Sequence, residues 1–230
     1  MKTIGMIGGM SWESSLEYYR IINQAVRQRL GGFHSAKCLL YSVEFSEVEV
    51  YQRSGNWDEL TELMINCAKI LKTGGADFVI ICTNTMHKMA DAVAEGAGIE
   101  ILHIAEAVGI EIQRRGIKKV GLLGTKFTME QDFYRKLLME NFAIETIIPD
   151  DADREAVHQV IYTELCQGIV SEKSRQRFID VSNRLREAGA EGIVLGCTEI
   201  PLLMRSKDID IPIFDTMQLH AVAAVERALC

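Results

Sequence analysis

The sequence predicts an α/β protein of two similar domains, each with a parallel four-stranded sheet, related by pseudo-twofold symmetry. Three observations support this prediction. Strand and helix patterns alternate along the chain, and 230 residues are enough for two domains of about 110. The third observation is a near repeat, in which residues 71–84 align without gaps with residues 185–198, an offset of 114 (198 − 84). In each copy a helix end, a Gly-Ala turn and an apolar strand are followed by small polar residues.

The first half contains four strand patterns with helices between them. Gly8 and Gly9 end the first strand in a tight turn, and Ser11 with Glu13 begins a helix that runs through residue 26. Short β-favouring runs and apolar spacing give the other elements. We expect strands at 2–8, 38–45, 78–82 and 100–104. We expect further helices at 58–72 and from Thr85 onward.

The second half repeats this order from Lys119. Residues 120–125 copy residues 4–9 (121 − 5 = 116), and residues 211–214 parallel 101–104 (213 − 101 = 112). We expect strands at 119–125, 143–148, 193–195 and 211–214, and helices at 154–167, 171–188 and 217–229. Four matched strands in one order indicate a duplicated domain with right-handed crossovers.

The domain boundaries follow from this match. The first domain is expected at residues 1–112 and the second at 113–215, with the junction near residues 109–116. The last helix has no clear counterpart after the first copy. We therefore expect segment 216–230 to cross back and pack on the first domain.

Composition excludes several classes of function. The chain is 48% hydrophobic and 25% charged, with a net charge of −7 and no run of Lys or Arg, so neither nucleic acid nor a membrane surface is an expected partner. No apolar stretch is long enough to span a membrane, and the first residues lack the pattern of a signal peptide. Six cysteines without a CxxC pair fit neither a disulfide scaffold nor a zinc site. A reducing cytoplasm is the expected location.

Cys197 and Thr83 occupy matched positions where a strand ends in each copy (197 − 83 = 114). Ligands bind at this end of parallel sheets, so we expect an active site in a cleft between the domains, with a thiol on one wall and a hydroxyl on the other. Turn amides after Cys197 are expected to lower its pKa toward neutrality. A buried core cysteine is the alternative. Cys82 should point away from Thr83 because strand side chains alternate, and hydrogen bonding at the strand end is as good an interpretation of Thr83 as catalysis.

Further polar groups near these strand ends are donors without a full positive charge. They suit a substrate carboxylate, although the same residues could cap the following helices. The group consists of Asn84, Thr85, Thr125 and Thr198, with the amides after Gly8 and Gly124. A dinucleotide site is poorly supported because the glycine pattern is not GxGxxG, and no phosphate-binding loop or histidine metal motif occurs. His87 and His103 lie near strand ends, where they could line the cleft.

Four segments resemble a known family. The segment Thr83-Asn84-Thr85-Met86-His87 looks like the CNTxH motif of the aspartate/glutamate racemases, with threonine in place of cysteine. Residues 196–201 (GCTEIP) look like that family's second motif, and residues 4–12 and 124–128 also match. The resemblance covers the whole chain and is closest to the enterobacterial branch of broad-specificity amino-acid or aspartate racemases.

The resemblance implies racemisation of a small-molecule amino acid without a cofactor or metal. In the family, one cysteine removes the α-proton and another returns a proton to the opposite face. Here Cys197 would be the thiolate base, acting on L substrates, and Thr83 would replace the second thiol. A homodimer is also implied. The alternatives are a single-cysteine decarboxylase acting on malonates, from the same superfamily, and an amino-acid-binding protein without catalysis.

The resemblance also suggests which residues contact the substrate. Met10 lies in the N-terminal motif, and Gln52 and Arg53 follow the second strand, where the family places ligands of the substrate side chain. Glu164 is near a position that is lysine in some aspartate-specific relatives. A carboxylate there would repel an acidic substrate unless it is protonated or paired with Arg53. The alternative is that Glu164 is a solvated residue on the helix surface. Glu199 is a possible supporting residue. Aspartate or glutamate is the family's default substrate, and a neutral polar amino acid such as homoserine is a competitor.

Overall fold

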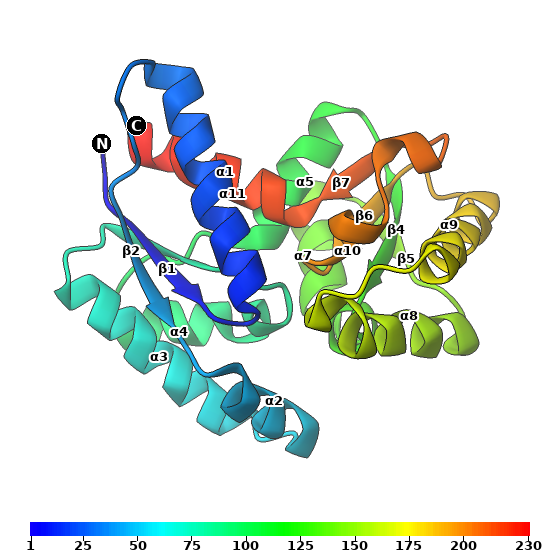
Figure 1. The fold of residues 1–230 in the computed structure, drawn as a ribbon, viewed down its shortest axis with the longest axis horizontal. Coiled ribbons are helices and arrows are strands. Elements are labelled where there is room, and N and C mark those ends of the chain that lie inside the picture. The colour runs from blue at the N-terminus through cyan, green and yellow to red at the C-terminus, as the bar shows by residue number, and fades with distance from the viewer. The chain divides into compact units, whose positions relative to one another are not determined.

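The computed structural model describes the chain from Met1 to Cys230. Its strands and helices form two compact units (Figure 1). Unit 1 comprises Met1–Ile104 and His220–Cys230, and unit 2 comprises Ala105–Leu219. None of the helices combines the length and apolar character needed to cross a membrane.

Unit 1 is built on a parallel sheet with the strand order β2-β1-β3. The strands are β1 (Ile4–Gly8), β2 (Cys38–Ser42) and β3 (Phe78–Ile81). The central strand β1 is wholly buried, as expected for a parallel sheet covered on both faces. The fourth strand expected at 100–104 is reduced to one parallel bridge between Val79 and Ile101. That part of the prediction is wrong because Ile104 already begins a helix, leaving no room for a longer ladder.

Helices surround this sheet. They are α1 (Trp12–Leu30), α2 (Phe45–Ser54), α3 (Trp57–Thr73), the 3-10 helix η1 (Thr85–Met89) and α4 (Ala90–Ala97). Ser11 caps α1 by accepting from the amide of Ser14, as its place before the helix predicts. The strand expected to reach residue 45 ends at Ser42, and α2 begins where the carboxylate of Glu44 accepts from the amide of Ser46. The alternating segment VEVY inside α2 favours a strand locally, so the sequence pattern did not predict this helix.

Unit 2 has a four-stranded parallel sheet with the order β5-β4-β6-β7. The strands are β4 (Lys119–Gly124), β5 (Glu145–Ile147), β6 (Ile193–Gly196) and β7 (Ile213–Asp215). The helices between them are α6 (Lys126–Glu130), α7 (Asp132–Phe142), α8 (Asp151–Thr163), the 3-10 helix η2 (Leu165–Gln167), α9 (Glu172–Glu187), α10 (Ile200–Leu203) and the 3-10 helix η3 (Ser206–Asp208). Parallel strands alternating with helices in both units confirm the predicted α/β class.

The helix that ends each half of the chain belongs largely to the unit formed by the other half. Helix α5 (Ile104–Arg114) follows the first half but lies almost wholly in unit 2, where Gly109 closely approaches the ring of Phe142. Helix α11 (Thr216–Leu229) follows the second half, and its residues from His220 onward lie in unit 1. The backbone amide of Lys2 donates to the carbonyl of Ala228 at 2.8 Å, so both chain ends belong to unit 1 (Figure 1). Helix α5 is thus the counterpart of α11 that the sequence did not reveal.

The boundaries differ from those drawn on the sequence. The first falls between Ile104 and Ala105, before the expected junction at 109–116, and the second falls after Leu219. The reason is that each boundary lies near the start of a helix that belongs to the unit of the other half.

Candidate functional site

Cys197 follows β6 directly, and its buried thiol has a carboxylate partner. The Sγ atom donates to Oε2 of Glu199 at 2.9 Å, and the hydroxyl of Thr198 donates to the same oxygen at 2.8 Å. All three side chains are buried. Burial and the nearby negative charges of Glu199 and Cys166 raise the pKa of Cys197 well above its usual value. The prediction that turn amides lower this pKa is therefore wrong, because burial of the thiol, followed by the charge of Glu199, outweighs them.

Thr83 lies two residues beyond the end of β3 and is half-buried. Its backbone carbonyl accepts a hydrogen bond from Nδ1 of His87 at 2.8 Å. Its neighbour Cys82 lies wholly in the core, where burial raises the pKa of the thiol. Of these two adjacent residues, only Thr83 has solvent-exposed surface.

Three imidazoles gather behind Thr83 within unit 1. The ring of His87 lies 4.7 Å from that of His103 and 5.4 Å from that of His220, centroid to centroid. Nε2 of His220 contacts the carbonyl of Leu102 at 2.8 Å, and its Nδ1 contacts the hydroxyl of Tyr18 at 2.9 Å. Because a carbonyl only accepts, His220 carries its proton on Nε2 and receives a hydrogen bond from Tyr18. Sequence reasoning found His87 and His103 but not His220, which is far away in the chain.

Burial keeps these imidazoles neutral. It lowers the pKa of His103 to about 4 and that of His220 to about 3. The pKa of His87 is also well below its usual value, first because of burial and then because of its two histidine neighbours. The cluster therefore acts through neutral hydrogen bonds near pH 7.

The four expected carboxylate-binding residues are buried, two in each unit. Asn84 precedes η1, Thr85 begins it, and Thr125 and Thr198 follow β4 and β6. Thr125 caps α6, since its hydroxyl accepts from the amide of Thr128 at 3.3 Å. For Thr125 the capping role is therefore real, and its hydroxyl is also within 3.2 Å of the hydroxyl of Thr128.

The residues expected to contact the substrate side chain in unit 1 differ in exposure. Met10 and Gln52 are buried, and Nε2 of Gln52 donates to Sδ of Met86 at 3.3 Å. Arg53 is mostly exposed and pairs with Glu49 on the same face of α2. An exposed pair of this kind is weak, so Arg53 remains available to an anionic partner.

Glu164 belongs to unit 2 and ends helix α8. Its Oε2 accepts from the hydroxyls of Ser171 and Ser174, at 3.0 and 2.7 Å. Glu164 is thus not a freely solvated helix residue. The two serines, which also begin α9, are a feature that sequence reasoning missed, although the pattern Ser-x-x-Ser before a helix is visible in the chain.

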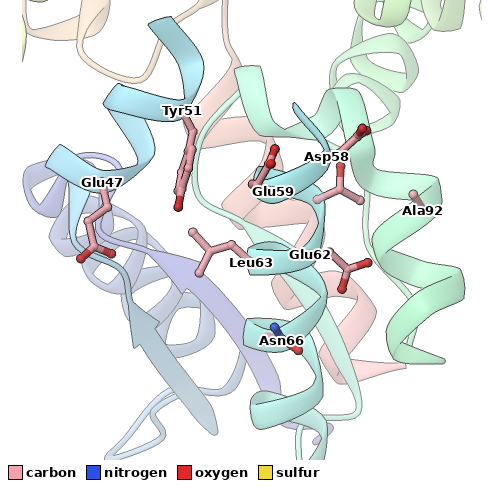
Figure 2. A pocket seen from close by; sticks show the side chains of 9 residues that line it. Glu47, Tyr51, Asp58, Glu59, Glu62, Leu63, Asn66 and Ala92 are labelled. Carbon is pink, nitrogen blue, oxygen red and sulfur yellow. The ribbon is translucent and has the colours of Figure 1, made fainter. Parts of the chain in front are cut away.

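A separate groove of about 820 Å³ lies on the surface of unit 1. Figure 2 shows it between α2 and α3, with the carboxylates of Glu47, Asp58, Glu59 and Glu62 around it. None of the predicted site residues lines this groove. Its concentration of negative charge disfavours an anionic ligand. We find no group of three or more His, Cys, Asp or Glu side chains arranged to hold a metal ion.

Comparison with known proteins gives a consistent result. The family model of the Asp/Glu/hydantoin racemases matches residues 7–224. The chain is 52% identical, over the full length of both proteins and with a TM-score of 0.94, to a crystal structure of a candidate Asp/Glu racemase from Yersinia pestis. It is 35% identical to an aspartate racemase homologue from Pyrococcus horikoshii, again over both full lengths, with a TM-score of 0.86.

A curated relative supports the same assignment. The broad specificity amino-acid racemase RacX of Bacillus subtilis is 26% identical over 172 residues, which cover 75% of this chain and 74% of RacX. The family model covers nearly the whole chain, including both segments that carry Thr83 and Cys197. On this evidence the chain belongs to the Asp/Glu/hydantoin racemase family.

Proposed function

We propose that this protein is an amino-acid racemase that inverts Cα by removing and returning a proton, without a cofactor. The observation that carries the proposal is the buried Cys197 thiol, hydrogen-bonded to Glu199 at the end of β6. The Cys197 sulfur lies 2.9 Å from a carboxylate oxygen of Glu199, so the thiol can transfer its proton to that oxygen and become a thiolate. The net charge of the pair stays the same. Family membership supports the reaction class.

In the proposed reaction, Cys197 is the base for L substrates. Its thiolate removes the α-proton, and Glu199 holds the proton that the thiol gave up. This arrangement fits the raised pKa of Cys197, because a weakly acidic thiol is a strong base once its proton has moved to a neighbour. Thr83 delivers its hydroxyl proton to the opposite face of the carbanion and takes one from solvent water, while the α-proton held by Cys197 is released to solvent. Since a threonine hydroxyl is a poor acid, this return step is the slow one.

The substrate carboxylate is assigned to the donors Asn84, Thr85, Thr125 and Thr198. Asn84 supplies an amide, and Thr85 and Thr125 supply hydroxyls; the hydroxyl of Thr198, which donates to Glu199 in this structure, would turn to the substrate carboxylate. Recognition of the substrate side chain is assigned to Met10, Gln52, Arg53 and Glu164. An acidic amino acid would pair with Arg53, whereas a neutral polar one such as homoserine would avoid repulsion by Glu164.

A screen of L amino acids in deuterated water tests the proposal. For the preferred substrate we expect deuterium at Cα to appear faster than the D enantiomer, because Cys197 can return a deuteron to the face from which it took the proton. Exchange no faster than inversion would show that Thr83 is an efficient proton donor and would overturn the slow-return step. Binding without exchange would indicate a non-catalytic amino-acid-binding protein.

The same screen, extended to malonates, tests the competing activity. The single thiol beside Glu199 also suits a decarboxylase, in which one cysteine only delivers a proton. Release of carbon dioxide from a malonate, with no deuterium uptake by any amino acid, would replace the racemase proposal.

We also propose a homodimer that works in the cytoplasm. All six cysteines are free thiols, which a reducing compartment would preserve. Trp12, Leu16 and Tyr19 lie on one face of α1 and are at least half exposed, as is common for surfaces that bind another protein. Light scattering would show a mass of twice 25.8 kDa if the proposal holds, and Leu16→Glu should reduce that mass if the interface includes α1.

A further inference from the structure

We propose that His87 is a positioning residue for Thr83, holding the Thr83 peptide so that its hydroxyl can return a proton to the substrate. The inference rests on the proposed function and extends it to a residue outside the reacting groups. Four observations support it: the local backbone, the hydrogen-bond direction, the packing around the imidazole, and the absence of an equivalent in the second half.

The local backbone leaves the Thr83 carbonyl to accept its hydrogen bond from a side chain. In an α-helical turn, the amide of residue 87 would donate to the carbonyl of residue 83. Here the turn is a 3-10 helix, and the amide of His87 donates to Asn84 instead, at 3.1 Å. The imidazole of His87 takes the vacated place, with Nδ1 at 2.8 Å from the Thr83 carbonyl. One residue thus satisfies two successive carbonyls after β3.

The direction of this bond fixes the tautomer. The Thr83 carbonyl can only accept, so Nδ1 of His87 carries the hydrogen. Burial against His103 and His220 keeps the imidazole neutral and limits its rotation, because the two rings pack edge-on against it. His220 is in turn held by the Leu102 carbonyl and by Tyr18. The donor to Thr83 is therefore packed against rings from α11 and from the chain after β3.

The second half lacks this arrangement. The residue matched to His87 is Pro201 (201 − 87 = 114), which has no N–H, and the Cys197 carbonyl accepts from the amide of Ile200 instead. The residue matched to His103 is Asp215 (215 − 103 = 112), and the one matched to His220 is Val108 (220 − 108 = 112). The imidazole cluster therefore belongs to the threonine half alone. A hydroxyl is a poorer proton donor than a thiol, so it depends more on correct placement.

The test compares His87→Leu with His87→Asn. Asparagine retains an N–H at about the position of Nδ1, whereas leucine fills the space without a donor. Tyr18→Phe is the matched control, since it removes a hydrogen bond of the same cluster that does not involve Thr83. In deuterated water, His87→Leu should lower inversion by about 10- to 100-fold while α-proton exchange changes less than about twofold. His87→Asn and Tyr18→Phe should keep the parent ratio of exchange to inversion.

A fall of both rates together in His87→Leu, or the same change of ratio in Tyr18→Phe, would overturn the inference and leave a structural role. If the leucine variant fails to fold, His87→Phe keeps a ring of similar size without the donor. A second readout does not require activity. Three-bond couplings to the Thr83 methyl group should report one χ1 rotamer in the parent and in His87→Asn, and averaged rotamers in His87→Leu.

This readout separates the two hypotheses. A parent that neither exchanges nor inverts any amino acid refutes the proposed function, and the methyl couplings then decide whether His87 positions Thr83. Couplings that are unchanged in His87→Leu would refute the positioning role, even where the parent is an active racemase.

Discussion

At the scale of single residues, the environment of Cys197 makes the thiol and its carboxylate partner one unit. An isolated thiolate beside Glu199 would place two negative charges in a buried site, which costs several kcal/mol in a low-dielectric interior. Transfer of the thiol proton to Glu199 avoids this cost because the pair keeps a single charge. The hydroxyl of Thr198, which also donates to Glu199, orients the carboxylate toward the thiol.

Replacement of Cys197 by serine should abolish most activity. The hydroxyl keeps the size of the thiol but is too weak an acid to form the base, so both exchange and inversion should fall by roughly 10²–10⁴-fold. Steady-state exchange and inversion rates measure the loss. Should Cys82→Ser remove activity while Cys197→Ser retains it, the thiol base would lie in the first half.

Replacement of Thr83 by cysteine should raise the inversion rate. The substitution adds a better proton donor at the matched position, and the exchange of groups of similar size should cost less than about 1.5 kcal/mol of stability. Inversion and α-exchange are compared with the parent on the same L amino acid. A variant that folds, binds substrate and inverts no faster would show that Thr83 is not the second acid–base group.

At the scale of elements, the turn between β1 and α1 depends on close backbone packing. Gly9 has a φ of +92°, and a Cβ at this position would clash with the carbonyl oxygen of Val43. The amide of Gly9 donates to the hydroxyl of Ser15 at 2.8 Å, which ties the turn to the first helix. The tight turn predicted at Gly8 and Gly9 is therefore present, and its physical basis includes contact with the segment after β2.

Gly9→Ala should destabilise the protein by about 2–5 kcal/mol, because left-handed strain adds to a clash with backbone atoms that cannot rotate away. Gly55→Ala is a matched control. Gly55 also has a positive φ, +72°, but no atom lies within 4 Å of its Cβ position, so only the strain of about 1–2 kcal/mol applies. Denaturant unfolding measures both values, and equal losses would show that the Val43 contact relaxes.

At the scale of the whole molecule, the histidine cluster joins the C-terminal helix to unit 1. His220 comes from α11, while its partners Leu102 and Tyr18 come from the first half of the chain. The groups that face the cluster include Asp91, whose charge opposes the lowering of the pKa of His103. Burial of neutral imidazoles makes the stability of this unit dependent on pH.

The protein should lose stability as the pH falls below about 6.5. The three histidines have folded-state pKa values below their unfolded value, so the unfolded chain binds more protons, and stability is fully present only above that unfolded value. Each histidine contributes up to about 1.4 kcal/mol per pH unit. Urea unfolding between pH 7.5 and 5 measures the slope while most carboxylates stay ionised.

His220→Gln is the variant that tests the source of this slope. It keeps an amide donor but removes one titrating group, so the slope should fall by up to about 1.4 kcal/mol per pH unit. An unchanged slope would show that other groups cause the loss.

The sequence by itself determined the α/β class and the matched strand ends that carry Thr83 and Cys197. These are local properties, because apolar runs, glycine turns and a gapless internal repeat can be recognised without knowing what packs against them. Strand limits depended on tertiary packing. The bridge at Ile101 replaced a full strand, and the alternating residues of α2 hid a helix, since in both places packing outweighed local pattern.

Only the tertiary structure decided the environment of the candidate site. The pKa of Cys197 is raised and not lowered, because burial and Glu199 act on it together, and burial depends on the whole fold. Likewise His220 meets Tyr18 across 202 positions of the chain, and α5 and α11 each complete the unit of the other half. Contacts between residues so distant in sequence leave no periodic signal, because they depend on where the crossovers bring each helix. In unit 1, such contacts surround His87, which donates to the carbonyl of Thr83.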